Sequence, residues 1–124
     1  MNKHQFSVQV RVRYVAEQSD PAGNLYLFAY TIRVENTGSV SAQLLSRHWI
    51  ITDGNDKVEE VRGPGVVGEQ PRLAPGESFE YTSGCPLGTP YGTMRGSYQC
   101  VAADGTSFEV PIPEFILTVP RVLH

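Results

Sequence analysis

Hydrophobic and polar residues alternate along the first part of the chain. Within residues 6–16 the apolar side chains fall on one side of the run, and polar ones such as Arg11 and Arg13 fall on the other. A period of two is typical of a β-strand that buries one face and leaves the other in water. We therefore expect a strand here whose core residues are Phe6, Val8, Val10, Val12 and Tyr14.

The same alternation predicts a second strand at 25–36 and a third at 42–52. In the third strand Leu45, Trp49 and Ile51 share one side, with Trp49 in the core, so His48 points to the opposite face. The second strand is expected to bury Tyr26, Phe28, Tyr30, Ile32 and Val34.

Shorter patterns predict the remaining strands and the segments between them. Strands are expected at 57–62, 78–83 and 93–103, and a last one returns through Phe108, Val110 and Ile112 before the apolar residues Phe115, Leu117 and Val119. Pro111 and Pro113 confine that last strand to a sheet edge or a bulge. The pattern lapses at 63–75, which predicts a long loop with room for a small strand. Residues 84–92 are rich in Gly and Pro, which predicts an irregular crossing.

Turn residues separate these runs every 8–12 positions, as in Asp53-Gly54-Asn55-Asp56 and Asp104-Gly105, and no segment has a helical pattern. This combination predicts an all-β fold. We expect one domain over residues 1–124, an immunoglobulin- or fibronectin type III-like β-sandwich of two antiparallel sheets with seven to nine strands.

Composition and charge narrow the function classes. The formal charge of −3 argues against a nucleic-acid binder, which usually has a clustered basic face. The longest apolar run, Leu25 to Tyr30, is far shorter than the roughly 20 residues that span a bilayer. Charged residues interrupt the N-terminal segment, so it lacks a signal-peptide core. These features predict a cytoplasmic protein without membrane association.

The two cysteines, Cys85 and Cys100, have a spacing that fits neither a redox pair nor a zinc site. Free thiols that pack as small buried hydrophobes are the favoured interpretation. A disulfide and a metal or redox role are the alternatives.

The segment Gly63-Pro64-Gly65-Val66-Val67-Gly68 is a literal GxGxxG. A dinucleotide site needs a helix directly after this motif, and Pro71 and Pro75 forbid one. The acidic ribose partner expected about 20 residues later is also absent, since 81–103 contains no Asp or Glu. Three roles stay open: a tight loop with positive φ angles, a surface for a protein partner, or an anion nest flanked by Arg62 and Arg72.

The sequence contains no recognisable catalytic or metal-binding set. GxSxG and GxxxxGK motifs are absent, and the three histidines (His4, His48 and His124) form no HxH or HExxH pairing. A predicted hairpin carries four carboxylate side chains, those of Asp53, Asp56, Glu59 and Glu60, and exposed charge is normal in such a hairpin. Weak cation binding there is the alternative. We predict no catalytic residue, no metal site and no cofactor.

Four runs of the sequence carry a family resemblance: SRHWIITDG at 46–54, VEEVRGPGVVGEQP at 58–71, LAPGE at 73–77 and YTSGCPL at 81–87. Together they closely resemble the ApaG family over essentially the whole chain. The resemblance implies a fibronectin-III-like sandwich in the bacterial cytoplasm, and a genetic link with a diadenosine-tetraphosphate hydrolase, cobalt resistance and magnesium efflux. It also implies a likeness to eukaryotic F-box and polymerase-associated proteins, whose related domains look like protein-interaction modules. Met is common in the family where this chain has Cys100, which implies a packing role there.

We therefore predict a non-enzymatic domain that binds an unidentified protein partner. A sensor of a phosphate-bearing nucleotide or a divalent cation at the glycine-rich segment is the alternative, and a weak homodimer through a strand edge is a third interpretation. The candidate contact residues are Arg47, His48, Arg62, Gly63, Pro64, Gly65, Val66, Val67, Gly68, Glu69 and Arg72.

Overall fold

The computed structural model describes residues 2–120 and contains eight β-strands. They are β1 (Phe6–Tyr14), β2 (Tyr26–Asn36), β3 (Ala42–Asp53), β4 (Val58–Pro64), β5 (Arg72–Leu73), β6 (Ser78–Leu87), β7 (Tyr91–Ala102) and β8 (Ser107–Thr118). Two three-residue 3₁₀ turns, η1 (Ala16–Gln18) and η2 (Pro21–Gly23), lie between β1 and β2. Neither is long and apolar enough to cross a membrane.

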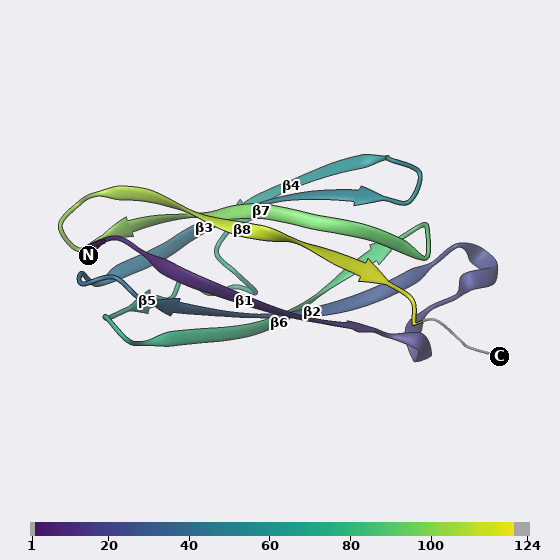
Figure 1. The fold of residues 1–124 in the computed structure, drawn as a ribbon, viewed down its shortest axis with the longest axis horizontal. Helices are drawn as coiled ribbons and strands as arrows, with labels where there is room; N and C mark the ends of the chain where they lie inside the picture. Colours follow the sequence, from purple (N-terminus) through teal and green to yellow (C-terminus); the bar gives the residue numbers. More distant parts are fainter. Residues whose placement is uncertain (1, 121–124) are drawn as a thin grey trace.

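The strands form two antiparallel sheets that lie face to face (Figure 1). One sheet has the order β1-β2-β6, and the other has the order β4-β3-β7-β8 with β5 paired to β3. Two layers of antiparallel strands packed on a common core make a β-sandwich, as the alternation predicts. Both the number of strands and the two-sheet architecture are confirmed.

The predicted core faces pack between the two sheets. Phe28, Ile32 and Val34 of β2 are fully buried, and Trp49 of β3 is 2% exposed. Val12 differs from the prediction, because it lies on an edge strand and is 37% exposed. Tyr81 of β6 and Tyr98 of β7 join their hydroxyl groups across the core. Burial raises the pKa of both phenols, so both stay protonated at neutral pH.

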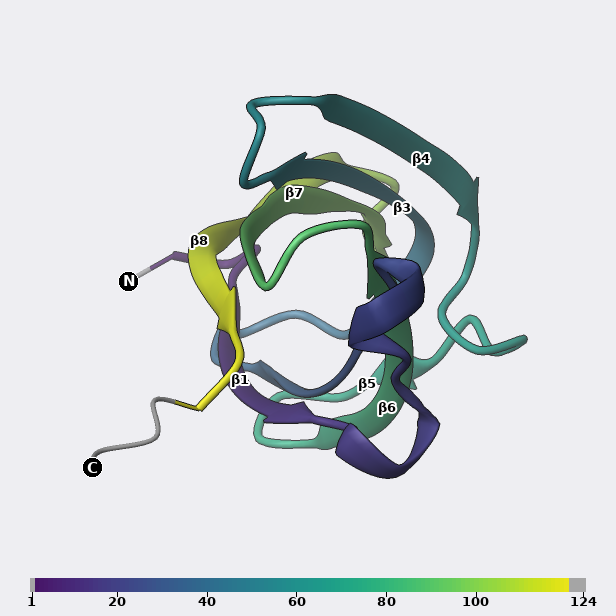
Figure 2. The ribbon, with the colours of Figure 1, turned by 90° about the vertical axis from the view of Figure 1, so that its right-hand side faces the viewer.

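The two sides of the sandwich differ. On one side β1 packs against β8, as the end view in Figure 2 shows. On the other side the free edges are β4, in the five-stranded sheet, and β6, in the three-stranded sheet. β8 is also an edge strand, as its two prolines predict.

Two predicted boundaries are wrong. β6 continues to Leu87 and β7 begins at Tyr91, so most of the expected crossing at 84–92 is strand. Of the two prolines that suggested irregularity, Pro86 lies on an edge strand, where its missing N–H costs no ladder hydrogen bond, and Pro90 lies in the short connection between β6 and β7. The small strand that was expected within 63–75 is β5.

The core face of β3 also differs from the prediction. The pairing register between β3 and β7 shifts between Leu44 and Ser46, which is a β-bulge at Leu45. Leu44 is therefore the fully buried residue, and Leu45 is only partly buried. The extra residue changes the phase of the strand, so Trp49 still faces the core beyond it.

Cys85 and Cys100 are buried free thiols, which confirms the favoured interpretation. Burial raises the pKa of Cys85 to about 11 and that of Cys100 to about 12. Both side chains are therefore uncharged at neutral pH and pack as small hydrophobes.

Asn36 is a buried polar residue that joins three segments at the end of β2. Its Nδ2 donates to the carbonyls of Val40 at 3.0 Å and Leu73 at 2.9 Å, and its Oδ1 accepts from the N–H of Gly38 at 2.9 Å. The side chain is 1% exposed and has all of its main hydrogen-bonding groups satisfied.

We predict that Asn36→Ala lowers the free energy of unfolding by roughly 3 kcal/mol, because two carbonyls lose the Asn36 amide and the N–H of Gly38 keeps only the Gln5 carbonyl. Urea unfolding followed by tryptophan fluorescence measures the change. Asn55→Ala, at an exposed turn position, is the control and should stay within about 0.5 kcal/mol of the parent chain. Equal losses in both variants would contradict this account of Asn36.

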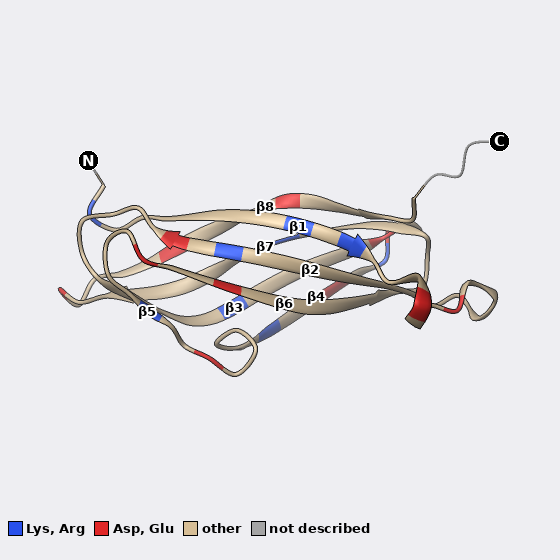
Figure 3. Cartoon of the chain, turned by 90° about the horizontal axis from the view of Figure 1, so that it is seen from below, with Lys and Arg blue, Asp and Glu red and all other residues tan. Residues whose placement is uncertain are grey.

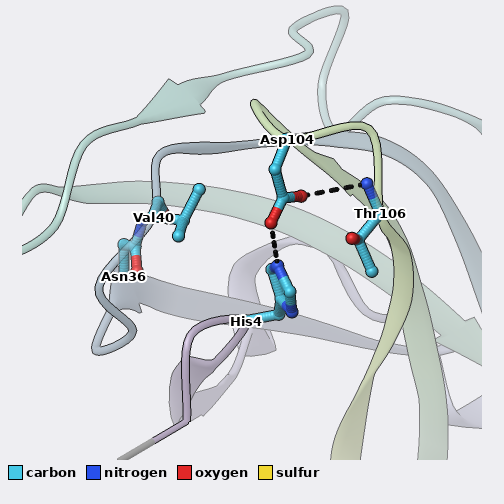
Figure 4. Close-up of polar contacts among 5 residues, drawn as sticks. All are labelled: His4, Asn36, Val40, Asp104 and Thr106. Atoms are coloured by element: carbon cyan, nitrogen blue, oxygen red, sulfur yellow. Dashed lines mark hydrogen bonds and ion pairs between the residues drawn. The ribbon is translucent and has the colours of Figure 1, made fainter.

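A hydrogen bond between His4 and Asp104 joins the N-terminal segment to the β7–β8 turn (Figure 4). His4 Nε2 lies 2.8 Å from Asp104 Oδ2, and Asp104 Oδ1 accepts from the N–H of Thr106 at 3.0 Å. The hydrogen bond from His4, followed by those from Thr106, lowers the pKa of Asp104 from 3.8 to about 2.

This shift predicts the sign of a pH effect. A carboxyl whose pKa is lower in the folded state stabilises the fold fully above about pH 4, and that contribution disappears as the pH falls to about 2. Because the carboxylate is exposed, solvent screening keeps the effect modest. A ¹³C NMR titration of the Asp104 carboxyl should give a midpoint near 2 that rises toward 3.8 in His4→Ala. An unchanged midpoint in His4→Ala would show that His4 is not the cause.

Candidate functional site

A groove of about 650 Å³ crosses the outward face of the five-stranded sheet. We call it the outer groove. Its position follows from the strand register, in which Ser46 pairs with Pro64 on one side and Gln99 on the other, and His48 pairs with Arg62 and Ser97. Residues paired across antiparallel strands point to the same face. The lining residues are Ser46, Arg47, His48, Arg62, Gly63, Pro64, Ser97, Gln99 and Glu109.

The floor of the outer groove is a chain of hydrogen bonds. Ser46 Oγ donates to Gln99 Oε1 at 2.7 Å, and Gln99 Nε2 donates to Ser97 Oγ at 2.9 Å. Ser97 is 6% exposed. A connected network of this kind holds polar groups in fixed positions before any partner arrives.

One wall of the outer groove carries mixed charge from β3 and β4. His48 Nε2 lies 2.9 Å from Glu60 Oε1, and Arg62 Nη2 lies 4.0 Å from the same oxygen. Neither Ser46 nor Ser97 hydrogen-bonds His48, so the described residues contain no serine–imidazole pair of the kind that activates a nucleophile. Over the whole described chain, acidic and basic residues are interspersed along the strands (Figure 3).

The neighbours Arg47 and His48 lie on opposite faces of β3. His48 faces the outer groove, whereas Arg47 pairs in register with Tyr98, whose side chain is fully buried. The Arg47 Nη1 donates to the carbonyls of Pro64 at 2.9 Å and Gly65 at 3.0 Å. Gly63 leaves room for this guanidinium, because a Cβ there would lie 3.0 Å from Nη1.

Residues 65–69 form a tight turn that we call the β4 turn. Val66 and Glu69 exchange two backbone hydrogen bonds at 2.8 and 2.9 Å, which leaves Val67 and Gly68 as a two-residue tip. Their φ angles are +43° and +83°, both positive as in a type I′ turn. The fully buried side chain of Val66 and the hydrogen bond from Gly65 N–H to the Leu45 carbonyl, 2.7 Å, fix the turn to the sandwich.

The β4 turn uses several of the N–H groups that an anion nest would need. Those of Gly65, Val66 and Glu69 already donate to carbonyls, which leaves those of Val67 and Gly68. Of the two flanking arginines, Arg62 is exposed and Arg72 Nη2 donates to Gln43 Oε1 at 3.2 Å. Binding of a nucleotide or a cation by this segment stays a prediction.

The four carboxylates of the β3–β4 hairpin do not converge on one point. Asp53 Oδ1 accepts from the N–H groups of Asn55 and Lys57, and Glu59 and Glu60 alternate along β4 and so face opposite sides of it. Within residues 2–120, no three His, Cys, Asp or Glu side chains are placed to hold a metal ion. His124 lies outside the described residues.

Pattern analysis missed the far half of the outer groove. Ser97, Gln99 and Glu109 were not among the candidates, although the alternation of β7 and β8 places them on the outward faces. The alternation gives the outward face of each strand. It gives no information on which strands lie beside β3, and that pairing is what brings these side chains to His48.

Comparisons with known proteins identify relatives of this chain. Residues 16–102 match the family model described as the ApaG domain. "Protein ApaG" of Bordetella pertussis is 65% identical over 121 residues, covering 98% of this chain and 92% of the relative. "Protein ApaG" of Thiobacillus denitrificans is 62% identical, covering 98% and 96%. A crystal structure from Bordetella pertussis, described as its ApaA protein, is 64% identical, covers 98% of both chains and has a TM-score of 0.94.

Two glycines of the β4 turn, Gly65 and Gly68, differ in how much space they leave for a side chain. Gly65→Ala should lower the free energy of unfolding by about 2 kcal/mol or more, because φ is +60° and the new Cβ would lie 2.4 Å from the Glu69 carbonyl oxygen. Gly68→Ala meets no atom within 4 Å and should cost only about 1 kcal/mol for its positive φ. Urea unfolding of both variants checks this difference. Equal costs would mean that the close contact at Gly65 is relieved by a small backbone shift.

Proposed function

The chain belongs to the ApaG family, and we propose that it works as a non-enzymatic protein-interaction domain in the cytoplasm. The proposed contact surface combines the outer groove with the β4 turn. The partner we propose is a protein, because the groove is a wide, open surface that mixes polar side chains with apolar area, as protein contact surfaces do. We propose no catalytic role, because its serines do not hydrogen-bond His48. We propose that the protein affects cobalt resistance and magnesium efflux, which the family resemblance implies, by binding that partner.

The observation that supports this proposal most is the conformation of Val67. This β-branched residue has a φ of +43° and a side chain that is 54% exposed. A non-glycine residue in the left-handed region is strained, and a β-branched one especially so. Folding stability alone favours Asn or Gly at this position of a type I′ turn. A valine at this position exposes an apolar side chain and lowers the stability of the fold. Contact between this side chain and a partner would explain why it is there.

The β4 turn is also rigid enough to serve as a contact. The Leu45 carbonyl accepts hydrogen bonds from Gly65 N–H and from Gln70 Nε2, at 2.7 and 2.9 Å, on the two sides of the tip. A side chain on a fixed turn loses little conformational entropy on binding. Binding residues are commonly found on loops that a rigid scaffold positions in this way.

The expected result with Val67→Asn is a more stable protein that binds its partner less well. The substitution removes the strain and should raise the free energy of unfolding by roughly 1 kcal/mol. It also removes the exposed apolar contact, so recovery of the partner should fall about tenfold, for a loss near 1.4 kcal/mol. Cross-linking in lysate of the source bacterium, followed by quantitative mass spectrometry of the recovered proteins, measures the second effect.

Val58→Asn is a matched control, since Val58 lies at the start of β4 and is 58% exposed, but has no positive φ. It should keep the partner and should not gain stability. Equal recovery by Val67→Asn and the parent chain would remove the β4 turn from the contact surface. Recovery of this chain itself as the cross-linked species would identify a homodimer instead.

A further inference from the structure

A second cavity, of about 230 Å³, lies between the two sheets on the side where β4 and β6 are the free edges. We propose that this inner cavity binds a small organic carboxylate. The inference goes beyond the proposed interaction surface, because the cavity lies on the inward face of β3 and the outer groove on the outward face, with Arg47 lining both. Its lining residues are Tyr30, Arg47, Trp49, Ile51, Glu59, Val61, Ser83, Gly84, Cys85, Pro86 and Met94.

Trp49 supplies the first argument. Its side chain lines the cavity and is 2% exposed, yet its Nε1–H has no acceptor among the described residues. Within residues 2–120 it is the one buried side-chain nitrogen or oxygen in this situation. A buried donor without a partner costs about 1–3 kcal/mol and is rare in folded proteins. The nitrogen itself is covered by its neighbours, so an acceptor oxygen of a molecule in the cavity would satisfy it after a small movement of the lining side chains.

Arg47 places a cation on the same wall. Residues two positions apart on a strand point to the same face, with their Cα atoms about 7 Å apart, so the side chains of Arg47 and Trp49 line the same cavity. The hydrogen bonds of Arg47 within the described chain use Nη1 alone, to Pro64 and Gly65. Its guanidinium therefore keeps N–H donors for another acceptor. A carboxylate offers two oxygens to such donors, and a charge-assisted hydrogen bond is stronger than a neutral one.

The rest of the lining suits a short apolar body. The rings of Tyr30 and Trp49 meet edge to face with centroids 5.4 Å apart, and Ile51, Val61 and Met94 add aliphatic and thioether surface. The volume is below the roughly 300–1,000 Å³ of sites for drug-sized molecules, so the ligand is correspondingly small. An apolar wall with a few placed donors is the usual composition of a small-molecule site.

The remaining polar groups limit the ligand further. Glu59, on the exposed edge strand β4, contributes a negative charge to the cavity. Burial, and to a lesser extent this charge, raise the pKa of Cys85 to about 11. A dianion such as a phosphate would be repelled by Glu59 more strongly than a monoanion. Because the Cys85 thiol stays protonated, it is not a nucleophile, and the ligand binds without a covalent bond.

Trp49 is the single tryptophan of the chain, which makes the test direct. Its indole N–H gives one cross-peak in a ¹H–¹⁵N spectrum of the labelled protein. Titration with butyrate should move this peak in a saturable way. Butyramide, a neutral molecule of nearly the same shape, and inorganic phosphate should move it at least tenfold less at equal concentration.

Variants of two arginines separate the cavity from the surface. Arg47→Gln should weaken butyrate binding at least tenfold, whereas Arg11→Gln, the same change on an exposed residue of β1, should leave it unaltered. The backbone cross-peaks show whether Arg47→Gln is folded. If it is not, the comparison of butyrate with butyramide on the parent chain decides the question alone. An indole peak that does not move at about 50 mM butyrate, or moves equally with butyramide, overturns the proposal.

Discussion

The bulge at Leu45 determines where the functional side chains of this protein lie. Ahead of the bulge the even-numbered residues of β3 face the core, as fully buried Leu44 shows, and beyond it the odd-numbered ones do, as buried Trp49 shows. If Leu45 were paired regularly instead of bulged, strict alternation from Leu44 would place His48 in the core and Trp49 in water. The one-residue insertion thus gives the five-stranded sheet a polar outer groove around His48 and an inner cavity beside Trp49.

The same bulge holds the glycine-rich segment. Leu45 is left out of the β3–β7 pairing, and its carbonyl accepts the N–H of Gly65 and the side-chain amide of Gln70. Each glycine of the GxGxxG run then has its own local reason. Gly63 makes room for the Arg47 guanidinium, Gly65 avoids the Glu69 carbonyl, and Gly68 supplies a positive φ at the tip. Local packing therefore accounts for a spacing that resembles a dinucleotide fingerprint, and no phosphate is needed to explain it.

Much of the fold could be predicted because most of the strands bury one face. Period two located β1 and β2, Trp49 identified the core of β3, and turn residues marked the β3–β4 and β7–β8 hairpins. The bulge could not be predicted, because Leu44 and Leu45 are equally apolar and the pattern does not show which of them is left unpaired. Strand pairing is a non-local property, so the meeting of Gln99 and Glu109 with His48 was equally out of reach. The Gly- and Pro-rich composition of 84–92 wrongly predicted an irregular segment, because an edge strand tolerates proline.

Arg47 is the physical connection between the two faces of β3. Its guanidinium lies on the wall of the inner cavity, and its Nη1 holds the carbonyls of Pro64 and Gly65, where β4 ends and the β4 turn begins. Pro64 also lines the outer groove, and Val67 follows three residues later. The same guanidinium therefore contacts both the inner cavity and the backbone that leads to the strained valine. A lysine would not serve the same purpose, because its single ammonium cannot bridge two carbonyls and a cavity with a planar, fixed set of donors.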